Sequence, residues 1–223
     1  MEQGIKISEK EAKIIEKKTQ DQAGSLWMQE REWRLTASNF GEICKITESR
    51  DIEKFCESMY NPKDLNHVPS IRHGKTYESV ALQKFTEVTG KKLKKSGFCV
   101  DPEYPYLGAT PDSFVQDEEA VVECKCPFAG RNSVIQPGKN FSFLEKVGDC
   151  VRLKRNNNYY YQLVGQMKLA KKNTGYFVVY TYKDLFYEKI TFDEDFFSNH
   201  MLPKLSDFYY QHYCPFVASE LKK

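Results

Sequence analysis

Residues 106–128 read YLGATPDSFVQDEEAVVECKCPF, and this stretch decides the fold. Its two alternating runs, 106–115 and 120–128, predict strands joined as a hairpin with its tip at Asp117 and Glu118. This register places Asp112 opposite Glu123, and facing residues of an antiparallel pair have Cβ atoms about 5 Å apart on one side of the sheet. Lys125 shares that side because side chains alternate along a strand. Two acids and one amine are therefore expected to converge, although Asp-Glu is a poor two-residue turn and leaves a slipped or wider register open.

A long helix is predicted before this hairpin, over residues 71–89. Glu78, Leu82 and Phe85 recur at helical spacing, and Gly90 is a suitable helix end. A carboxylate on an apolar helix face is costly to bury without a partner. Glu78 is therefore expected either to lie at the wet edge of the helix or to serve a cation.

The remaining periodic segments complete an α/β fold with a mixed central sheet flanked by helices. We expect Ser38 or Asn39 to cap a helix running through 40–46, and Pro203 to kink or divide the last helix. The other expected elements are a loop at 61–70, strands at 97–100, 175–182 and 185–192, a helix after Asn156, and the last helix at 194–213.

The chain has 223 residues, of which 40% are hydrophobic, and this is enough for one substantial core. We predict a charged arm or helix over residues 1–25 and a single domain over 26–223. No run approaches the roughly 18 uncharged apolar residues that a membrane span needs, so no membrane contact is expected. Seven cysteines without a regular framework predict reduced thiols, and hence an intracellular location in cytoplasm or nucleus rather than secretion.

A net charge of +2 does not by itself indicate a nucleic-acid-binding protein. Two basic clusters do so locally: the lysines of GKKLKKSG at 90–97, and VRLKRNNNYYY at 151–161, in which three tyrosines follow the cations. Such clusters neutralise phosphates and stack on bases in some proteins, and in others they are ordinary solvated turns. Both readings remain open at this stage.

The acid pair of the hairpin suits a hard divalent cation, because two facing carboxylates repel unless a cation or a proton intervenes. Magnesium takes one or two carboxylates and several waters, so Asp112 and Glu123, with the main-chain carbonyl of Cys124, are candidate ligands. Lys125 is suited to orient a water and to offset charge at a phosphate, and Glu78 to complete the outer ligand shell.

Two other interpretations of these residues remain. Asp112 follows a proline and is compatible with a plain turn, and Glu123 with Lys125 is compatible with an exposed charged pair. Cys124 and Cys126 form a CxC motif on the opposite strand face, which raises zinc. The chain offers no second cysteine or histidine pair at suitable spacing, so zinc is the weaker hypothesis.

Four motifs in order resemble the lambda exonuclease or YqaJ-type viral recombinase family of the PD-(D/E)xK nuclease superfamily. They are HGKTYESVALQKFTEVTG (73–90), GATPD (108–112), VECKCPF (122–128) and YYYQLVGQMKLAKKNTGYF (159–177). The resemblance implies a restriction-endonuclease-like core and catalytic roles for Glu78, Asp112, Glu123, Lys125 and Gln162. It also implies Mg²⁺, for which Mn²⁺ substitutes, and a 5′-to-3′ exonuclease that digests one strand of double-stranded DNA from its ends in recombination or repair.

An upstream element, Trp27, Arg31 and Thr36-Ala37-Ser38, resembles the family segment that holds the 5′ phosphate through its arginine and serine. Family members often have a glycine between these parts, whereas this chain has Glu32 to Leu35, so Arg34 is a second candidate for the phosphate. The resemblance further implies a ring-shaped trimer and a single-strand annealing partner. A related endonuclease, an RNA-directed nuclease, and a nucleic-acid-binding module with a decayed site are the alternative functions.

Overall fold

The computed structural model describes residues 6–222. The order of its helices and strands is α1 (Glu9–Lys18), α2 (Gly24–Glu32), β1 (Leu35–Thr36), α3 (Ala37–Ile43), α4 (Ile52–Tyr60), α5 (Pro69–Thr89), β2 (Leu93–Lys94), β3 (Leu107–Gly108), β4 (Ser113–Val115), β5 (Ala120–Lys125), β6 (Leu144–Val147), β7 (Cys150–Leu153), α6 (Asn158–Leu169), β8 (Thr174–Tyr180), β9 (Leu185–Thr191), η1 (Phe196–Met201), α7 (Leu202–Phe208), η2 (Tyr209–Tyr213) and α8 (Cys214–Glu220).

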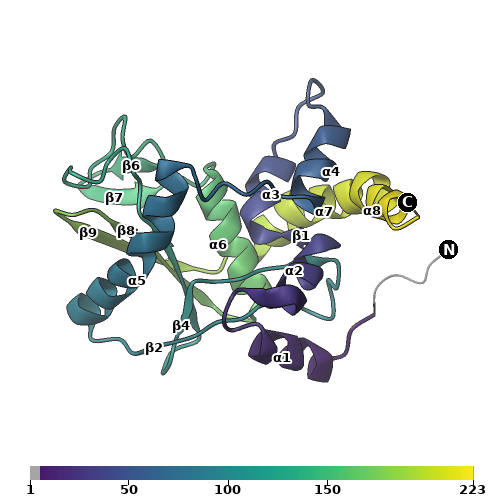
Figure 1. The fold of residues 1–223 in the computed structure, drawn as a ribbon. Coiled ribbons are helices and arrows are strands. Elements are labelled where there is room, and N and C mark those ends of the chain that lie inside the picture. The colour runs from purple at the N-terminus through teal and green to yellow at the C-terminus, as the bar shows by residue number, and fades with distance from the viewer. Residues whose placement is uncertain (1–5, 223) are drawn as a thin grey trace.

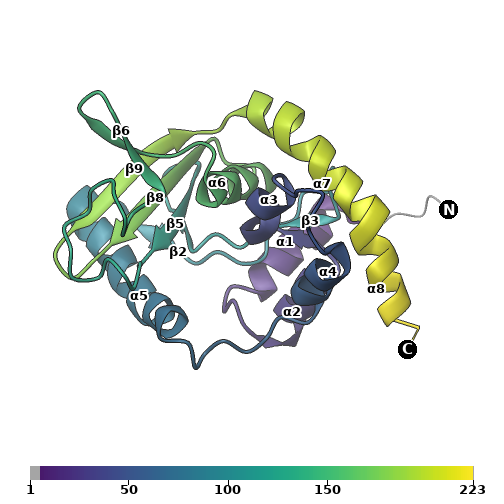
Figure 2. The same ribbon diagram turned by 90° about the horizontal axis from the view of Figure 1, so that it is seen from above.

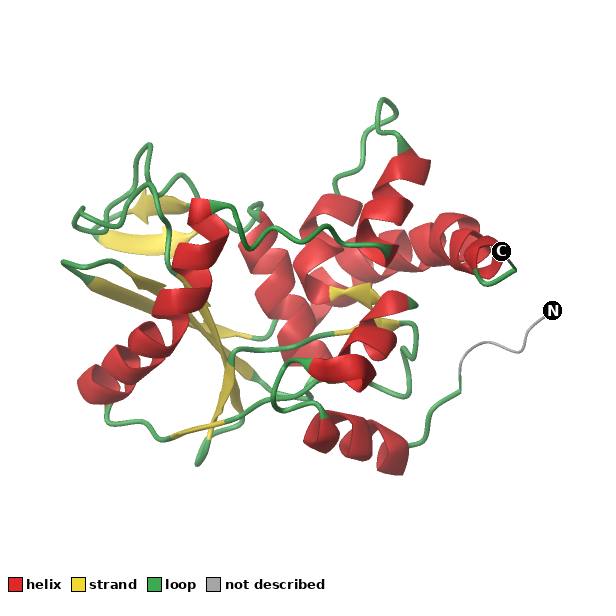
Figure 3. Ribbon diagram, in the orientation of Figure 1, coloured by secondary structure: helices red, strands yellow, loops and turns green. Residues whose placement is uncertain are grey.

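A five-stranded mixed sheet in the order β2-β4-β5-β8-β9 lies at the centre (Figures 1 and 3). β4 pairs antiparallel with β5, β5 pairs parallel with β8, and β8 pairs antiparallel with β9. Figure 2 shows α5 on one side of the sheet, whereas α6, α3 and the C-terminal helix lie on the other. The predicted mixed sheet flanked by helices is confirmed.

The alternation along β5 decides which core each side chain enters. Val121 packs with Leu163 and Met167 of α6 in the larger core cluster. Val122 and Cys124 belong to a second cluster with Ala81 and Phe85 of α5. Each apolar strand face therefore has its own helix, and residues with the parity of Val121 face α6.

The predicted hairpin register is also confirmed, because Ser113 pairs with Val122 and Phe114 with Val121. The long upstream strand expected over 106–115 is instead divided into β3 and β4 by the Thr110–Asp112 segment. Of the strand expected at 97–100, only an isolated bridge between Cys99 and Ala109 forms.

The helix starts differ from two predictions. Thr36, rather than Ser38 or Asn39, is the N-cap of α3. No side-chain capping bond forms there, because the Thr36 hydroxyl instead contacts the Ser38 hydroxyl and the side-chain amide of Asn39. The expected loop at 61–70 ends two residues early, since Pro69 begins α5 and proline is favoured in a first helical turn. The predicted end of α5 is confirmed, with Gly90 at φ 70°.

The last helix extends beyond the predicted limit of residue 213 to Glu220. Its α-helical parts are separated by the π-helical segments η1 and η2, and Pro203 and Pro215 lie in the first turns of α7 and α8 that follow them. A proline ring clashes with the carbonyl four residues earlier, and a wider π turn moves that carbonyl away. The chain therefore passes both prolines without a break.

Two strand pairs were not predicted. Residues 93–94 of the lysine-rich segment form β2, which pairs with β4 at the sheet edge. Residues 144–153 form the β6–β7 hairpin, which has its own two-stranded pairing. Short strands with charged side chains carry little hydrophobic alternation, so the sequence pattern did not indicate them.

Helices α3 and α6 approach closely because a glycine lies on each of them. A Cβ atom on Gly41 would be 2.6 Å from the Cα of Asn158, and one on Gly165 would be 2.5 Å from the ring of Phe40. This contact fixes the position of α6, which carries two amide side chains of the candidate site. Within residues 6–222, no helix is both long and apolar enough to cross a membrane.

Candidate active site

The two strand acids lie where β4 and β5 separate. The last paired residues there are Ser113 and Val122, so Asp112 precedes β4 while Glu123 continues β5. The Cys124 amide donates to Asp112 Oδ2 over 2.6 Å, so a side-chain carboxylate takes a position that a ladder carbonyl would otherwise fill. Asp112 is thereby held against the strand that carries the second acid.

Glu123 is the most enclosed member of the site, with 2% of its surface exposed. Its Oε1 accepts from Lys125 Nζ over 2.5 Å and from Gln162 Nε2 over 2.6 Å, and its Oε2 accepts from Gln166 Nε2 over 2.6 Å. Gln162 Oε1 in turn accepts from Lys125 at 3.2 Å. These bonds orient the carboxylate and leave Oε2 with spare acceptor capacity.

Sequence reasoning missed Gln166 as a site residue. It lies one helical turn after Gln162, so the spacing on α6 was an available signal. Besides bonding Glu123, its amide donates to the Thr110 carbonyl over 3.3 Å, while its own Oε1 is buried without a hydrogen-bond partner among the described residues. A buried amide oxygen in a carboxylate site is suited to a water or a hard cation.

The charges of Asp112, Glu123 and Glu78 act on one another. Burial, followed by the charges of Glu123 and Glu78, raises the pKa of Asp112 well above its ordinary value. Burial and the charge of Glu123 also raise the pKa of Glu78, which therefore reaches the site from α5 across the sheet edge. Burial lowers the pKa of Lys125, but Glu123 and Asp112 outweigh it and raise that pKa above the usual range. Lys125 is thus a protonated donor.

The two strand cysteines have a different environment. Cys124 lies in the core cluster under α5 and Cys126 packs against it, on the strand face opposite Glu123. Burial raises the pKa of the Cys126 thiol to about 12, so this thiol is not a ready thiolate ligand for zinc. Within residues 6–222, no three His, Cys, Asp or Glu side chains form a ready-made metal cluster.

The upstream residues predicted to hold a 5′ phosphate lie together. Arg31, Arg34, Thr36 and Ser38 all line one cavity of about 730 Å³ between the α2 region and the end of α4. The Thr36 and Ser38 hydroxyls are 3.1 Å apart. Four polar side chains from eight consecutive residues therefore line one space, which the end of α4 closes on the other side.

The two arginines differ in what they already bind. Arg34 is 2% exposed and donates to the Pro105 carbonyl, to the Glu30 carbonyl and to the Glu30 carboxylate. Arg31 instead lies over the Trp27 ring at 4.3 Å, and burial lowers its pKa. No carboxylate of the described residues pairs with Arg31, which leaves its guanidinium available to an anion.

Residues just before and within α2 brace the segment that carries Asp112. The Gln22 amide donates to the carbonyls of Ser96 and Pro111, each over 3.0 Å, and the Trp27 indole donates to Thr110 Oγ1 over 3.3 Å. Gln22 has φ 51°, a left-handed conformation that a non-glycine residue keeps only when its surroundings hold it. The N-terminal region thus contacts the residue next to the candidate catalytic aspartate.

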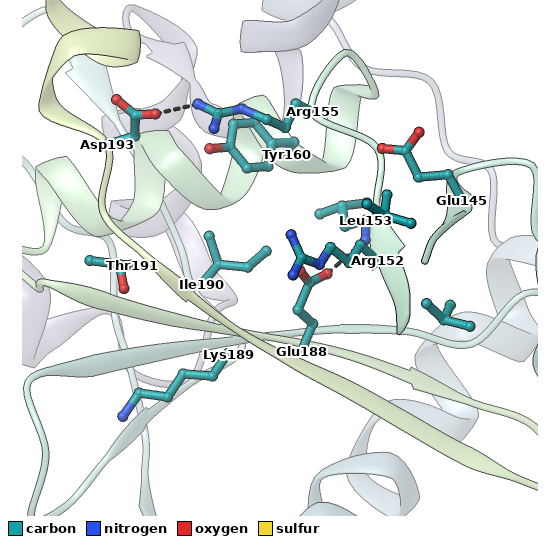
Figure 4. Close-up of a pocket in the computed structure, with 12 residues that line it drawn as sticks. Glu145, Arg152, Leu153, Arg155, Tyr160, Glu188, Lys189, Ile190, Thr191 and Asp193 are labelled. Carbon is teal, nitrogen blue, oxygen red and sulfur yellow. Dashed lines mark hydrogen bonds and ion pairs between the residues drawn. The ribbon is translucent and has the colours of Figure 1, made fainter. Parts of the chain in front are cut away.

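One cation of each predicted basic cluster forms an ion pair among the described residues. Lys91 of the first cluster binds Glu118, which also binds Lys189 of β9. Figure 4 shows the second cluster in a cavity of about 600 Å³ between the β6–β7 hairpin and β9, where Arg155 pairs with Asp193. The three tyrosines at 159–161 pack into or against the core rather than forming an open stacking surface.

Residues 26–176 match the family model of the YqaJ-like viral recombinase domain. The chain belongs to this family. The match spans all five predicted catalytic residues, whereas Gln22 and α1 precede the YqaJ-like domain. A comparison with curated protein sequences finds no match.

Solved structures share the fold of this YqaJ-like domain. The alkaline exonuclease LHK-Exo from Laribacter hongkongensis, solved alone and with dAMP, is 18% identical with a TM-score of 0.65, covering 88% of this chain and 96% of that chain. A phage-related exonuclease from Haemophilus somnus 129PT is 14% identical with a TM-score of 0.56, covering 87% and 99%. The SOX protein in a DNA complex is 12% identical with a TM-score of 0.60, covering 90% and 70%. Family and PD-(D/E)xK-like fold together support a nuclease domain.

Proposed function

We propose that this chain is a magnesium-dependent deoxyribonuclease that digests one strand of double-stranded DNA from its 5′ ends. The observation that carries the proposal is the enclosed Glu123 carboxylate, held by Lys125, Gln162 and Gln166 beside Asp112. A purely structural ion pair would not need a second and a third acid against it, because each added negative charge raises the cost of burial.

The donor set fits a magnesium ion. Three acids face a single ammonium group, so the site has excess negative charge, and the buried oxygen of Gln166 lacks a partner among the described residues. Asp112, Glu123 and the Cys124 carbonyl would hold the ion, with Glu78 in the outer shell. When bound, magnesium, or manganese in its place, polarises the phosphoryl oxygen and lowers the pKa of water.

The side chains supply positioning and charge. Lys125 stays protonated, so it acts as a donor that orients the attacking water and offsets charge developing on the phosphate, not as the base. Gln162 fixes the Lys125 ammonium, and Gln166 fixes the Glu123 carboxylate against the Thr110 segment. The enclosed network would thereby keep the reacting groups aligned.

We assign end recognition to the Arg31 cavity. Arg31 has a free guanidinium, and Thr36 and Ser38 add hydroxyl donors, which together match a terminal phosphate. Arg34 supports the cavity through Glu30 and keeps its position in the wall. We propose DNA as the substrate because LHK-Exo is solved with dAMP and SOX with DNA, and the RNA test below is needed because SOX is also solved with RNA.

The central test uses a linear duplex labelled at both 3′ ends, with magnesium or with a chelator. Magnesium-dependent loss of one strand, faster for 5′-phosphorylated than for 5′-hydroxyl ends, is expected. Lys125→Ala should reduce the rate about 10²- to 10³-fold. Lys168→Ala is the matched control, since this lysine is similarly enclosed and paired with Glu194. Equal activity of the two variants would exclude the proposed mechanism.

Tests with further substrates distinguish the alternative functions. A closed circular duplex should remain intact if ends are required, and its cleavage would indicate an endonuclease. Preference for an RNA strand would indicate an RNA-directed enzyme. Chelator-sensitive binding without hydrolysis of any substrate would indicate a binding module with a decayed site.

The family resemblance also leads us to propose a ring-shaped homotrimer, a single-strand annealing partner and an intracellular, reducing location. All seven cysteines are free thiols, which supports the last of these. Sedimentation of the purified protein tests the trimer, because a monomer at micromolar concentration would contradict it.

A further inference from the structure

A cluster of aromatic side chains lies at the end of the sheet beside the candidate site. Its members come from the first half of α5, from the turn after β5 and from the end of β8. We call these residues the aromatic platform: His73, Tyr77, Phe128, Tyr180 and Tyr182, with Arg131 at its border.

The rings form a continuous contact network. The centroid of the Tyr77 ring lies 4.5 Å from that of His73, 5.0 Å from that of Tyr182 and 6.3 Å from that of Tyr180. The Tyr77 and Tyr180 rings are stacked, with an interplanar angle of 24°. His73 contacts Phe128 edge-on at 5.5 Å and meets the Tyr182 hydroxyl at 3.4 Å from Nδ1. Three separate segments therefore hold the rings in fixed orientations.

The platform is open to solvent on one side. His73 is 8% exposed and forms its base, whereas Tyr182 is 46% exposed and the other three rings are half-buried. A cluster that existed only for packing would not need to present a tyrosine ring so openly. Pre-ordered, exposed aromatic surface of this kind is typical of a binding site.

The border of the platform is cationic. Arg131 lies 3.8 Å over the Phe128 ring, donates to the Phe128 carbonyl over 2.6 Å, and has no carboxylate partner among residues 6–222. The nearby Asp184 carboxylate is occupied by the Ile135 and Leu185 amides. An aromatic surface with an unpaired guanidinium matches nucleic acid, in which flat bases alternate with phosphates.

The platform adjoins the candidate active site. Lys125 pairs with Val179 in the β5–β8 ladder, and Tyr182 is three residues further along the chain, or about 10 Å. Tyr77 directly precedes Glu78 on α5. Lys125 faces α6 whereas the platform lies on the α5 side of the sheet, so a strand would pass round the end of the sheet between them. One strand spacing of about 5 Å adds to the roughly 10 Å of chain, and stacked nucleotides rise by about 3.4 Å, so the platform lies about five nucleotides from a phosphate at Lys125.

We propose that the aromatic platform binds unpaired bases of the strand held at the active site, by stacking on Tyr182 and Tyr77, while Arg131 contacts a phosphate. This proposal rests on the proposed function only in requiring that a nucleic-acid strand occupies the site. Its role is to hold a separated strand in line for the next hydrolysis step.

Binding is measured by fluorescence anisotropy of a labelled DNA oligonucleotide of about 15 nucleotides, in chelator so that no hydrolysis occurs. Tyr182→Ala should weaken Kd by about 5- to 150-fold, because one base–aromatic stack is lost. Tyr182→Phe should stay within about twofold of the wild type, and Arg131→Gln should weaken binding and its salt dependence. Unchanged Kd in Tyr182→Ala would overturn the proposal.

Tyr210→Ala is the matched control. Tyr210 is 58% exposed and also packs on two tyrosines, Tyr106 and Tyr209, but it lies in the C-terminal helix. The Tyr210→Ala variant should bind DNA with the Kd of the wild type. An equal loss of DNA affinity in Tyr182→Ala and Tyr210→Ala would reject a specific platform. Thermal unfolding of each variant checks folding, and Tyr182→Leu replaces the alanine variant if that one unfolds.

A scan with single abasic nucleotides separates stacking from packing. If Tyr182 stacks on a base, one abasic position within about five nucleotides of the scissile phosphate weakens wild-type binding, and Tyr182→Ala loses nothing more there. Strictly additive losses at every position would refute stacking. If binding depends on Tyr182 but no substrate is hydrolysed, the proposed activity alone is refuted. If substrate is hydrolysed but neither Kd nor KM depends on Tyr182, the platform alone is refuted.

Discussion

Removing one charge from the acid cluster tests its electrostatics directly. Asp112→Asn keeps an oxygen acceptor for the Cys124 amide but removes a negative charge next to Glu123 and Glu78. Charges about 5 Å apart repel by about 3 kcal/mol at an effective dielectric of about 20. One of the two repulsions is offset by attraction to Lys125, so we expect the metal-free variant to be more stable by about 3 kcal/mol.

For a chain of this size, about 3 kcal/mol corresponds to a rise in Tm of about 6–12 °C. The folded pKa of Asp112 is raised, so its stabilising, protonated form is lost as pH rises above the ordinary value of 3.8 through the folded pKa. The difference in unfolding free energy between the wild type and Asp112→Asn should therefore be large near pH 7.5 and should shrink as the pH falls toward 4.

The assay is thermal unfolding in chelator and then in magnesium. Magnesium at 100 times its Kd stabilises the wild type by about 2.7 kcal/mol and should scarcely stabilise Asp112→Asn. Asp184→Asn is the control, because two backbone amides bind that carboxylate and its substitution should leave stability equal or lower. A lower Tm for metal-free Asp112→Asn, or equal stabilisation of both proteins by magnesium, would refute the reasoning.

Three further outcomes are expected. Gln22→Ala should lower kcat about fivefold with little change in KM, because the Pro111 carbonyl beside the proposed catalytic residue Asp112 loses its donor. Gln20→Ala should leave kcat unchanged, and equal kcat values for the two variants would contradict the brace. Burial raises the pKa of Glu118, but hydrogen bonds from two lysines and a tyrosine outweigh it and lower the pKa to about 2. Glu118→Gln should therefore cost about 1–3 kcal/mol at pH 7 in chemical denaturation, with the cost disappearing between about pH 4.5 and 2, and a pH-independent difference would count against this ion pair. Gly41→Ala should destabilise the fold by about 1–3 kcal/mol, because its Cβ would meet the backbone of α6, and an unchanged Tm would show that the helices separate freely.

Two contacts of the N-terminal region could not be predicted from the sequence pattern. We predicted a charged arm or helix over residues 1–25, and of this region residues 1–5 lie outside the described part of the chain. Within residues 6–25, the Thr19 hydroxyl accepts from the Phe98 backbone amide over 2.7 Å, and the Gln22 side-chain amide donates to the Pro111 carbonyl. Neither contact leaves a periodic signal, because each joins one polar side chain to a distant backbone group.

Three local features follow from the amino-acid pattern alone: the hairpin that places Asp112 beside Glu123, the strand parity shared with Lys125, and the helix that carries Glu78. Alternation and turn spacing act between residues that are near in the chain, so a pattern suffices to fix them. Packing between distant segments places Gln166 in the site, leaves Arg31 rather than Arg34 without a carboxylate partner among residues 6–222, and brings five rings from three segments into one surface. These outcomes depend on which distant segments pack together, and non-local packing is set by the shape and burial of the whole chain.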